Sequence, residues 1–258
     1  MSRRDLKIDI DATARNAIRL RERDLHAAFL SPIDYARESS DYCIVPDVGV
    51  SSQVRGGSVA LHFRAGIRDI TSMAVDPSSL SEIVLATIIL SEEFDIKPKI
   101  VPVPGSLEGM LKKADSALLI GDAAVREAET HHDVLDVVEE WNVLTGVPYV
   151  HGFWCAREND LSQEEILLLQ TVGAQAPSLL GEIVETDARG HQLGGISPAA
   201  LNEYLESFAY ELTPDDMEGL REFLKYAYYH GVIPDVAEVS FFTSTHSDGA
   251  AADDLSVN

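Results

Sequence analysis

The sequence is poor in cysteine, and the few cysteines that it has form no recognisable motif. Cys43 and Cys155 stand far apart, and neither belongs to a Cys-x-x-Cys pair. The sequence therefore predicts neither a disulfide framework nor a zinc site. Both residues lie in apolar stretches, where a cysteine usually packs as a small hydrophobic side chain.

Positive charge is also scarce. The 258 residues include 20 lysines and arginines against 43 aspartates and glutamates, a formal net charge of -23. A field of that sign repels polyanions, so we expect no nucleic-acid partner and no membrane partner. The longest apolar-rich run, residues 83–90, is far shorter than the roughly 20 residues that span a bilayer. The basic opening residues are not followed by an apolar run, so we expect a soluble cytoplasmic protein without a secretory signal.

Several common catalytic signatures are missing. The sequence has no Gly-x-Gly-x-x-Gly, no Walker A loop, no His-Glu-x-x-His and no Gly-x-Ser-x-Gly. These absences remove the usual sequence evidence for dinucleotide binding, nucleotide hydrolysis, zinc proteolysis and α/β-hydrolase chemistry. The evidence for function has to come from less regular features.

Short β-like runs alternate with helical stretches, a pattern typical of the α/β class with helices covering a parallel sheet. We expect strands at residues 6–10, 42–50, 58–63, 72–75, 99–103 and 116–120, and helices at 12–23, 80–94 and 107–113. Residues 149–156 form another extended apolar run, and helices follow it. Three of the helix starts carry capping residues, at Ser162, Ser197 and Thr213.

The strand and helix units fall into two series, which predicts two α/β lobes. We expect lobe 1 to comprise residues 1–63 and 149–242, and lobe 2 to comprise residues 64–148. Residues 58–63 and 149–155 are expected to be adjacent crossovers that join the lobes. The Ser/Asp/Ala-rich residues 243–258 are expected to form a disordered tail.

Two strand-turn-helix units are suited to holding an anion. In the first, Ser78, Ser79 and Ser81 surround a helix start, where hydroxyls and unpaired backbone N–H groups suit a carboxylate or a phosphate. The alternative is that Ser79 only caps the helix and Glu82 closes a capping box. If an anion does bind there, Glu82 is the residue that competes for the same N–H groups.

The second unit is a buried-looking strand that ends at Gly121, with a helix beginning at Asp122. Ligands of α/β sheets lie beyond the carboxyl ends of strands, and a glycine lets the backbone approach them closely. Asp122 also fits an ordinary N-cap. His151, in the apolar run between the lobes, is either a functional histidine or a buried histidine with satisfied hydrogen bonds.

Five stretches occur in an order that carries a family resemblance: LHAAFLSPIDYA at 25–36, DPSSLS at 76–81, ADSALLIGDAA at 114–124, EEWNVLTGVPYV at 139–150 and FWCA at 153–156. Together they resemble the menaquinone-biosynthesis family that includes chorismate dehydratase of the futalosine route. The likeness covers roughly residues 8–235, and residues 114–124 are its most specific part.

The resemblance implies a type II periplasmic-binding-protein fold, with a ligand held between two lobes. It also implies the loss of water from chorismate to give 3-[(1-carboxyvinyl)oxy]benzoate, with no cofactor and no metal. A dicarboxylate substrate of this kind would use the two anion-binding units. The substrate-binding residues expected on this basis are Ser52, Ser58, Ser78, Ser79, Ser81, Gly121 and Asp122, and no catalytic residue is assigned.

The sequence departs from the family pattern at several positions. Family members open with a strand that ends in Ser-Tyr-Leu-Asn, and this sequence begins after that unit. Leu80 and Glu82 stand where the family usually has arginine and serine. We therefore expect weak turnover of chorismate, and self-association through an unpaired sheet edge. The alternatives are a non-catalytic protein of the same fold that binds a small carboxylate, and a chain whose true start lies upstream.

Overall fold

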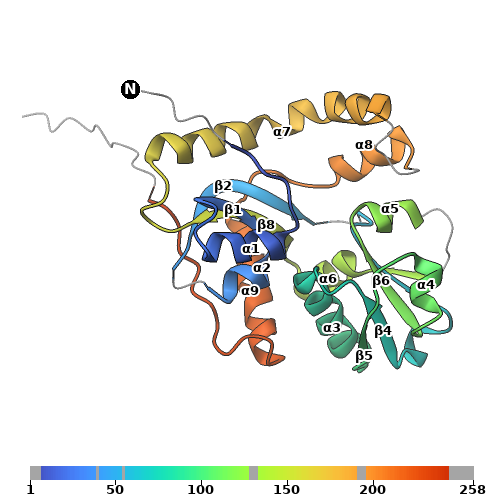
Figure 1. The fold of residues 1–258 in the computed structure, drawn as a ribbon. Coiled ribbons are helices and arrows are strands. Elements are labelled where there is room, and N and C mark those ends of the chain that lie inside the picture. The colour runs from blue at the N-terminus through green and yellow to red at the C-terminus, as the bar shows by residue number, and fades with distance from the viewer. Residues whose placement is uncertain (1–6, 39–40, 54–55, 128–132, 191–195, 244–258) are drawn as a thin grey trace, which may run out of the picture.

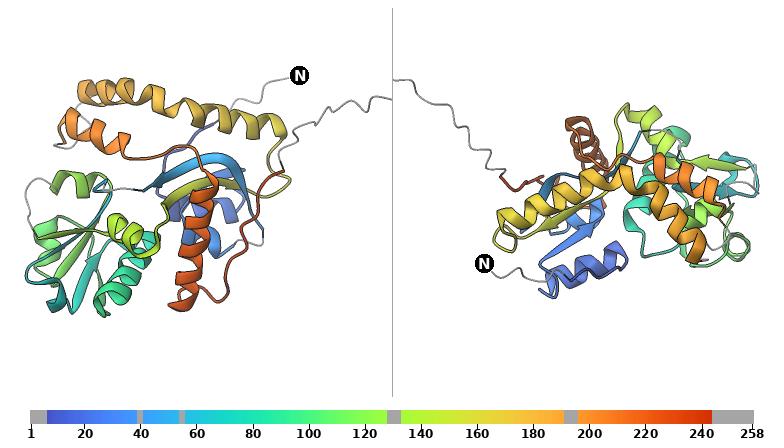
Figure 2. Two further views of the ribbon diagram at one scale, coloured as in Figure 1. Left: turned by 180° about the vertical axis from the view of Figure 1, so that it is seen from behind. Right: turned by 90° about the horizontal axis from the view of Figure 1, so that it is seen from above.

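The strands form two separate sheets, one in each of two lobes (Figure 1 and Figure 2). The computed structural model describes residues 7–38, 41–53, 56–127, 133–190 and 196–243. One sheet has three strands in the order β1-β8-β2, and the other has five in the order β5-β4-β6-β3-β7. The α/β class expected from the sequence is confirmed. The expected disordered tail, 243–258, lies outside the described residues except for Thr243.

The sheet of the first lobe is antiparallel throughout. Its central strand β8 (Tyr149–Ala156) pairs with β1 (Ala27–Leu30) on one side and with β2 (Cys43–Ser52) on the other. The expectation of a parallel sheet is wrong for this lobe, because β8 returns from the second lobe in the direction opposite to both neighbours.

Helices cover both faces of this sheet. α2 (Pro32–Ala36) and α9 (Pro214–Tyr229) pack against one face, and α7 (Gln163–Gly190) crosses the other face over β2. α1 (Thr13–Arg21) packs beside β1. Successive side chains of a strand point to opposite faces of the sheet, so Phe153 and Trp154 lie in different apolar clusters.

The three expected helix caps are confirmed. Ser162 and Glu165 exchange hydrogen bonds at the start of α7, and Thr213 and Asp216 do the same at the start of α9. Ser197 caps α8 (Pro198–Glu206), with a proline at the first helical position. These local signals fix where the helices of the C-terminal part begin.

The sheet of the second lobe is mixed. β4 (Ser72–Val75), β5 (Lys99–Pro102) and β6 (Ser116–Ile120) run parallel, whereas β3 (Val59–Phe63) pairs antiparallel with β6 and with β7 (Val134–Asp136). α3 (Leu80–Phe94) and α6 (Val137–Thr145) share an apolar core with one face, and α4 (Leu107–Leu111) and α5 (Asp122–Glu127) with the other. A single 3-10 turn, η1 (Ile67–Asp69), precedes β4.

The crossover expected at residues 58–63 is wrong. β2, and not β3, is the neighbour of β8, with Ser52 opposite Tyr149. β3 lies inside the second sheet, with Val59 opposite Ile120. Apolar alternation predicts a strand but does not say which sheet it joins, so the pattern could not separate β2 from β3. The two sheets therefore place residues 59–63 with the second lobe, not with the first.

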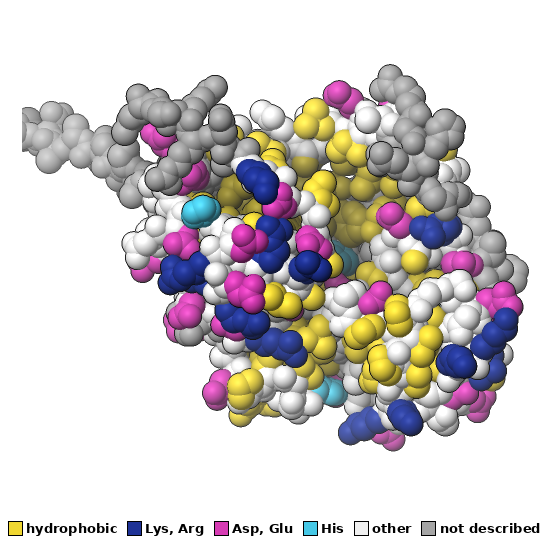
Figure 3. Space-filling view, viewed as in Figure 1, with side chains coloured by type: hydrophobic (Ala, Val, Ile, Leu, Met, Phe, Trp, Pro, Cys, Tyr) yellow, Lys and Arg dark blue, Asp and Glu magenta, His cyan; other side chains and the backbone are white. Residues whose placement is uncertain are grey.

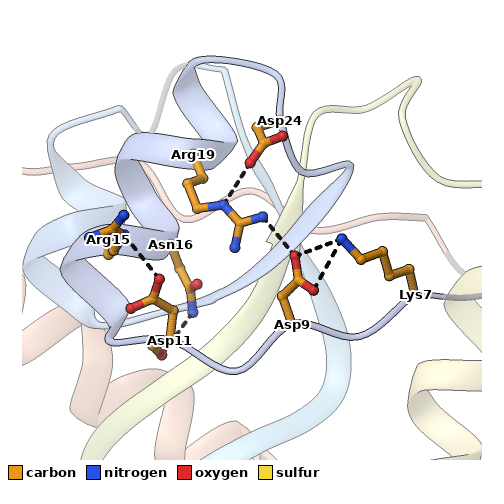
Figure 4. A network of polar contacts seen from close by, with 7 residues as sticks. All are labelled: Lys7, Asp9, Asp11, Arg15, Asn16, Arg19 and Asp24. Atoms are coloured by element: carbon orange, nitrogen blue, oxygen red, sulfur yellow. Dashed lines mark hydrogen bonds and ion pairs between the residues drawn. The ribbon is translucent and has the colours of Figure 1, made fainter.

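The strand expected at residues 6–10 is also wrong for the described residues 7–10, which pair with no strand. Ile8 and Ile10 are 78% and 99% exposed, so the alternating pattern buries nothing. The segment instead runs beside α1, where Asp9 forms a 2.7 Å ion pair with Arg19 (Figure 4). The segment therefore makes ion pairs with α1 in place of the expected pairing with a strand.

The lobes share one apolar core. Trp141 of α6 is fully buried, and its ring meets the rings of Phe223 and Tyr226 of α9 at 5.9 and 5.6 Å. On the opposite side of the molecule, α8 packs against α7 and contacts α5, so this helix pair reaches from the first lobe to the second (Figure 2). None of the helices in the described ranges is long and apolar enough to cross a membrane.

Candidate functional site

The space between the two sheets is where strand ends from both lobes meet. β2 ends at Ser52 opposite the start of β8, and β6 ends at Ile120 opposite the start of β3. The space-filling view is hollowed between the lobes, and the hollow is lined largely by hydrophobic side chains (Figure 3). Polar groups that project into such a place are candidates for ligand contacts.

His151 and Ser52 form a polar pair where β2 ends beside the start of β8. Ser52 Oγ lies 2.7 Å from His151 Nε2, and the imidazole is half-buried. Burial lowers the pKa of His151 to about 3, so the ring is neutral at physiological pH. A neutral imidazole has one N–H donor and one acceptor nitrogen, so it orients Ser52 by a hydrogen bond and carries no charge.

Aromatic rings surround this histidine. The ring of Tyr149 lies edge-on at 4.9 Å on one side, and that of Phe208 lies edge-on at 5.1 Å on the other. Phe208 in turn packs against Tyr204 of α8 at 4.9 Å. The rings keep water from His151 and form an apolar wall beside the polar groups.

Three buried hydroxyls near the strand ends, on Ser51, Ser58 and Tyr149, have no hydrogen-bond partner within the described part of the chain. Ser58 Oγ and Tyr149 Oη are both buried, at 3% and 0% residue exposure. A buried hydroxyl without a partner costs stability, and such groups often mark places where a ligand supplies the missing bond. Burial also raises the pKa of Tyr149 well above its ordinary value, so the phenol stays a hydrogen-bond donor.

Gly121 and Asp122 lie at the end of β6, on the side of the second lobe. Gly121 has a φ of 60°, a backbone conformation that favours glycine, and its N–H donates to the carbonyl of Ser58 at 2.8 Å. A Cβ at this glycine would lie 3.8 Å from Tyr204 Oη. Asp122 is exposed, and its charge contributes to the raised pKa of Tyr204 after the larger effect of burial. The turn at Gly121 therefore faces α8.

The serines at the start of α3 do not form a single cluster. Ser78 is exposed and donates to Asp76 Oδ1 at 2.7 Å, and Ser79 is the N-cap residue but its side chain makes no capping bond. The alternative expectation of a capping box between Ser79 and Glu82 is therefore wrong. Ser79 leaves the helix N-terminus without a side-chain cap.

Ser81 makes hydrogen bonds within the protein and is not accessible to a ligand. It is fully buried, accepts a hydrogen bond from the N–H of Ile33 at 3.0 Å and donates to Ser31 Oγ at 2.8 Å. Ser31 donates in turn to Asp34. Because Ile33 and Asp34 belong to α2 and Ser81 to α3, this chain of bonds ties the two lobes together.

Glu82 is the residue that the sequence analysis expected to compete with an anion at the start of α3. The half-buried carboxyl accepts a hydrogen bond from its own backbone N–H, which lowers its pKa, but burial has the larger effect and raises the pKa to about 7. The charge of Asp34 on α2 also raises the pKa of Glu82, and the charge of Glu82 in turn raises the pKa of Tyr149 on β8 and of Tyr204 on α8. Glu82, on α3 of the second lobe, therefore interacts electrostatically with residues of the first lobe.

Of the residues expected from the sequence, the structure brings Ser52 and Ser58 to the strand ends between the lobes, with Gly121 beside Ser58 and Asp122 next to it. Ser79 lies at the start of α3. Ser78 bonds within its own turn and Ser81 lies inside the lobe contact. Sequence reasoning missed Tyr149, Tyr204 and Phe208. No local signal in the sequence distinguishes an aromatic ring that lines a cleft from one inside a core.

Among the described residues, no group of three or more histidine, cysteine, aspartate or glutamate side chains is placed to hold an ion. The polar groups between the lobes are chiefly hydroxyls, one neutral imidazole and carboxyls. Such a set can hold a polar organic ligand by hydrogen bonds.

Solved structures similar to this one share its two-lobe fold. Protein AF1704 from Archaeoglobus fulgidus has a TM-score of 0.69 at 18% identity, covering 87% of this chain and 86% of that one. The periplasmic aliphatic sulphonate binding protein SsuA from Escherichia coli has a TM-score of 0.63 at 16% identity, covering 88% and 82%.

A Candida albicans gene product described as having the generic periplasmic binding protein fold has a TM-score of 0.61 at 10% identity, covering 92% of this chain and 86% of that one. At these identities the likeness shows the fold alone, which is that of the periplasmic binding proteins. The sequence profile of a menaquinone-biosynthesis family matches residues 5–229, nearly the whole described chain. The chain therefore belongs to the menaquinone-biosynthesis family.

Proposed function

We propose that this protein is a chorismate dehydratase-like member of its family, which eliminates water from chorismate to give 3-[(1-carboxyvinyl)oxy]benzoate. The observation that carries the proposal is the pair of buried hydroxyls, on Ser58 and Tyr149, without partners in the described residues, between the lobes of a menaquinone-biosynthesis protein. Tyr149 belongs to β8 of the first lobe, and Ser58 directly precedes β3 of the second. A ligand that bonds to both would join the two lobes.

The chemistry of the cleft suits a ring that carries carboxylates. Tyr149 and Ser58 are positioned to donate hydrogen bonds to carboxylate oxygens, and the aromatic wall of Phe208 and Tyr204 suits the face of a six-membered ring. The open N-terminus of α3 offers backbone N–H groups to an anion. These groups supply anion binding in a chain of net charge -23 without a cationic residue.

The elimination itself removes one ring hydrogen and the neighbouring hydroxyl, and the ring becomes aromatic. The protein has to hold the hydroxyl and the hydrogen in one geometry and keep the ring from bulk water. The hydrogen-bonded pair of Ser52 and His151 is suited to positioning a hydroxyl, because the neutral ring fixes the orientation of the serine. The low basicity of His151 makes it a hydrogen-bond partner and a poor general base.

The test is turnover and binding by the purified chain of residues 1–258. Chorismate is incubated with protein in excess, and the product is followed by chromatography. We expect the product to form, and Ser58→Ala to weaken the binding of product about 2- to 10-fold, the effect of one hydrogen bond. Ser178→Ala, which alters an exposed serine of α7, serves as the matched control and should leave binding unchanged.

The alternative is a non-catalytic protein that binds a small carboxylate in the same cleft. It is favoured by Glu82, a half-buried carboxyl whose charge acts on Tyr149, one of the hydroxyls proposed to bind the substrate. Binding of the product with no turnover in excess protein would support this alternative. Failure to bind either chorismate or its product would refute both functions.

A further inference from the structure

The helix α7 carries a stripe of exposed apolar side chains along one side. Leu168, Val172, Leu179 and Ile183 are 40%, 56%, 41% and 44% exposed. Their spacings of four and seven residues place them on one face of the helix. A contiguous apolar surface of this kind on a globular protein is typical of an interaction site, whereas single exposed apolar residues are common.

The contacts of α7 with its own chain use a different face. The backbone of Gly173 lies against Val48 of β2, and Val184 packs in one apolar cluster with Leu201 of α8. The helix lies at the outer surface of the molecule, with the rest of the chain on one side of it (Figure 1 and Figure 2). The apolar stripe is therefore accessible to another molecule.

The region around the stripe has no charged side chain. Residues 166–181 contain no acid and no base, in a chain of which 24% is charged and which has a net charge of -23. Glu165 and Glu182 flank this run at its two ends. Two copies of so acidic a chain repel each other over most of their surfaces. This face lets a second copy approach without carboxylates in the centre of the contact.

The order of residues in the stripe matches its own reverse. Leu168 lies as far before the midpoint between positions 175 and 176 as Ile183 lies after it, and the same holds for Val172 and Leu179. In a two-fold symmetric contact, residue i meets residue j and residue j meets residue i. Two antiparallel copies of α7 related by an axis at this midpoint therefore pair Leu168 with Ile183 and Val172 with Leu179.

The residue nearest the axis is also suited to meeting its own copy. Gln175 is exposed, and its side-chain amide has both donors and an acceptor, so two copies can bond to each other. The ends of the chain offer no alternative occupant. Residues 1–6 and 244–258 have no amphipathic run of large apolar side chains that could cover the stripe.

We propose that α7 is a homodimerisation surface, on which a second copy of this chain packs its own α7 antiparallel about a two-fold axis near Gln175. The inference does not depend on the proposed function. The stripe is about 22 Å long. A standard interface buries about 800 Å² per partner, more than one helix pair of this length supplies, so the expected dimer is weak, with a Kd of about 10–100 µM.

Sedimentation velocity measures the association of the purified chain of residues 1–258 between 1 and 300 µM, in 0.1 M and in 0.5 M NaCl. We expect a monomer at the lowest concentrations and chiefly a dimer at the highest. The Kd should fall about 3- to 10-fold at the higher salt concentration, because salt screens the repulsion between two chains of net charge -23. A dimer held together by ion pairs would respond in the opposite direction.

A pair of matched variants tests the surface. Leu179→Glu places two carboxylates in the seam of each dimer, so it should weaken association more than tenfold and leave a monomer at 300 µM. Leu167→Glu makes the same change on the same helix, at a residue that is 63% exposed and points about 100° away from Leu168. It should dimerise like the unaltered chain. Because both residues are exposed, circular dichroism and thermal melting should show that both variants are folded.

A mixing experiment tests the antiparallel pairing. Val172→Lys alone should also be monomeric, because it places a cation against Leu179 of the other copy. When it is mixed with Leu179→Glu, the introduced cation and carboxylate lie opposite each other and the second pair of Val172 and Leu179 stays apolar. The mixture should therefore form a heterodimer, although neither variant dimerises alone.

Three results would overturn the inference. The first is an unaltered chain that remains monomeric at 300 µM in 0.5 M NaCl. The second is a dimer that Leu179→Glu leaves intact, or that Leu167→Glu disrupts equally, since such a dimer uses another surface. The third is a mixture of Val172→Lys and Leu179→Glu that stays monomeric, which rules out the two-fold antiparallel pairing.

Discussion

A substitution at Tyr149 tests whether the cleft contains a buried hydroxyl that has no hydrogen-bond partner. Its side chain is fully buried at the start of β8, and its ring packs edge-on against His151 and Phe223 at 4.9 and 5.4 Å. The ring contacts do not involve the hydroxyl, which has no protein partner among the described residues. Tyr149→Phe removes the hydroxyl and keeps the ring.

The expected effect is stabilisation, which is unusual for a substitution in a core. An unsatisfied buried polar group costs about 1–3 kcal/mol, so its removal should raise the free energy of unfolding by about 1 kcal/mol. In a chain of this size, that change raises Tm by roughly 2–4 °C. The affinity for the product should fall about 2- to 10-fold, because the ligand loses one hydrogen bond.

Tyr35 is the matched control. It is equally buried in the same lobe, but its hydroxyl donates to the carbonyl of Glu238 at 3.0 Å and accepts from the N–H of Ser240 at 3.2 Å. Tyr35→Phe leaves both backbone groups without this partner, so it should destabilise the protein by about 1–3 kcal/mol. The same chemical change is therefore expected to have opposite signs at the two positions.

Urea denaturation and thermal melting at pH 7 measure both variants against the unaltered chain. The reasoning is refuted if Tyr149→Phe is less stable than the unaltered chain by 1 kcal/mol or more, since that loss would show that the hydroxyl has a partner, such as Glu82. A gain in stability with no change in product affinity would show that the hydroxyl does not contact the ligand.

Two further predictions concern stability. Burial raises the pKa of Glu82 from 4.5 to about 7, so between these pH values the folded state holds a proton that the unfolded state has lost. The free energy of unfolding of the unaltered chain, relative to that of Glu82→Gln, should therefore fall by at most about 3 kcal/mol as the pH rises from about 4.5 to 7. Above pH 7 it should fall no further. Parallel curves for the two proteins in denaturation at each pH would show that the carboxyl is not buried. A Cβ at Gly219 of α9 would lie 2.0 Å from the carbonyl oxygen of Pro148, so Gly219→Ala should cost about 1–3 kcal/mol in the same assay. Gly181→Ala on α7, where nothing lies within 4 Å, should be neutral or stabilising, and equal losses at both glycines would contradict the close packing of α9.

The local elements were predictable where the apolar pattern is strong. Residues 80–94 form a helix with the expected bounds, and between residues 83 and 90 this helix is buried on nearly every side. The strands at 72–75 and 116–120 also have the expected bounds. In these cases the residues that decide the structure are neighbours in the sequence.

The sheet partners were not predictable in the same way. The pattern predicts that β2 and β3 are strands, but only contacts far along the chain assign them to their sheets, from β2 to β8 about a hundred positions away and from β3 to β6 about sixty positions away. Residues 7–10 alternate like a strand, yet they join neither sheet and lie beside α1, where Asp9 forms an ion pair with Arg19. Which strand neighbours which depends on the whole chain, and periodicity measures only one segment at a time.

The serine cluster shows the same limit at the scale of a single turn. Ser79, Ser81 and Glu82 are close in sequence, but successive residues of a helix point about 100° apart, so the three side chains meet different neighbours. Ser81 points toward α2 and takes part in the contact between the lobes, whereas Glu82 acts electrostatically on Tyr149 and Tyr204. Proximity in the sequence therefore overstated the number of serines that a ligand could reach.

The cleft differs in charge from the chain that forms it. The chain carries a net charge of -23, yet His151 is neutral, the phenol of Tyr149 is neutral and Glu82 is ionised only in part near pH 7. In each case burial, which penalises the charged form, is the largest cause. An anion that enters the cleft thus leaves the strongly negative surface for a nearly neutral interior that offers hydrogen-bond donors. Because burial penalises the charge of the ligand as well, hydrogen-bond donors have to supply the stabilisation that arginine or lysine supplies in most anion sites, and ionisation of Glu82 works against it.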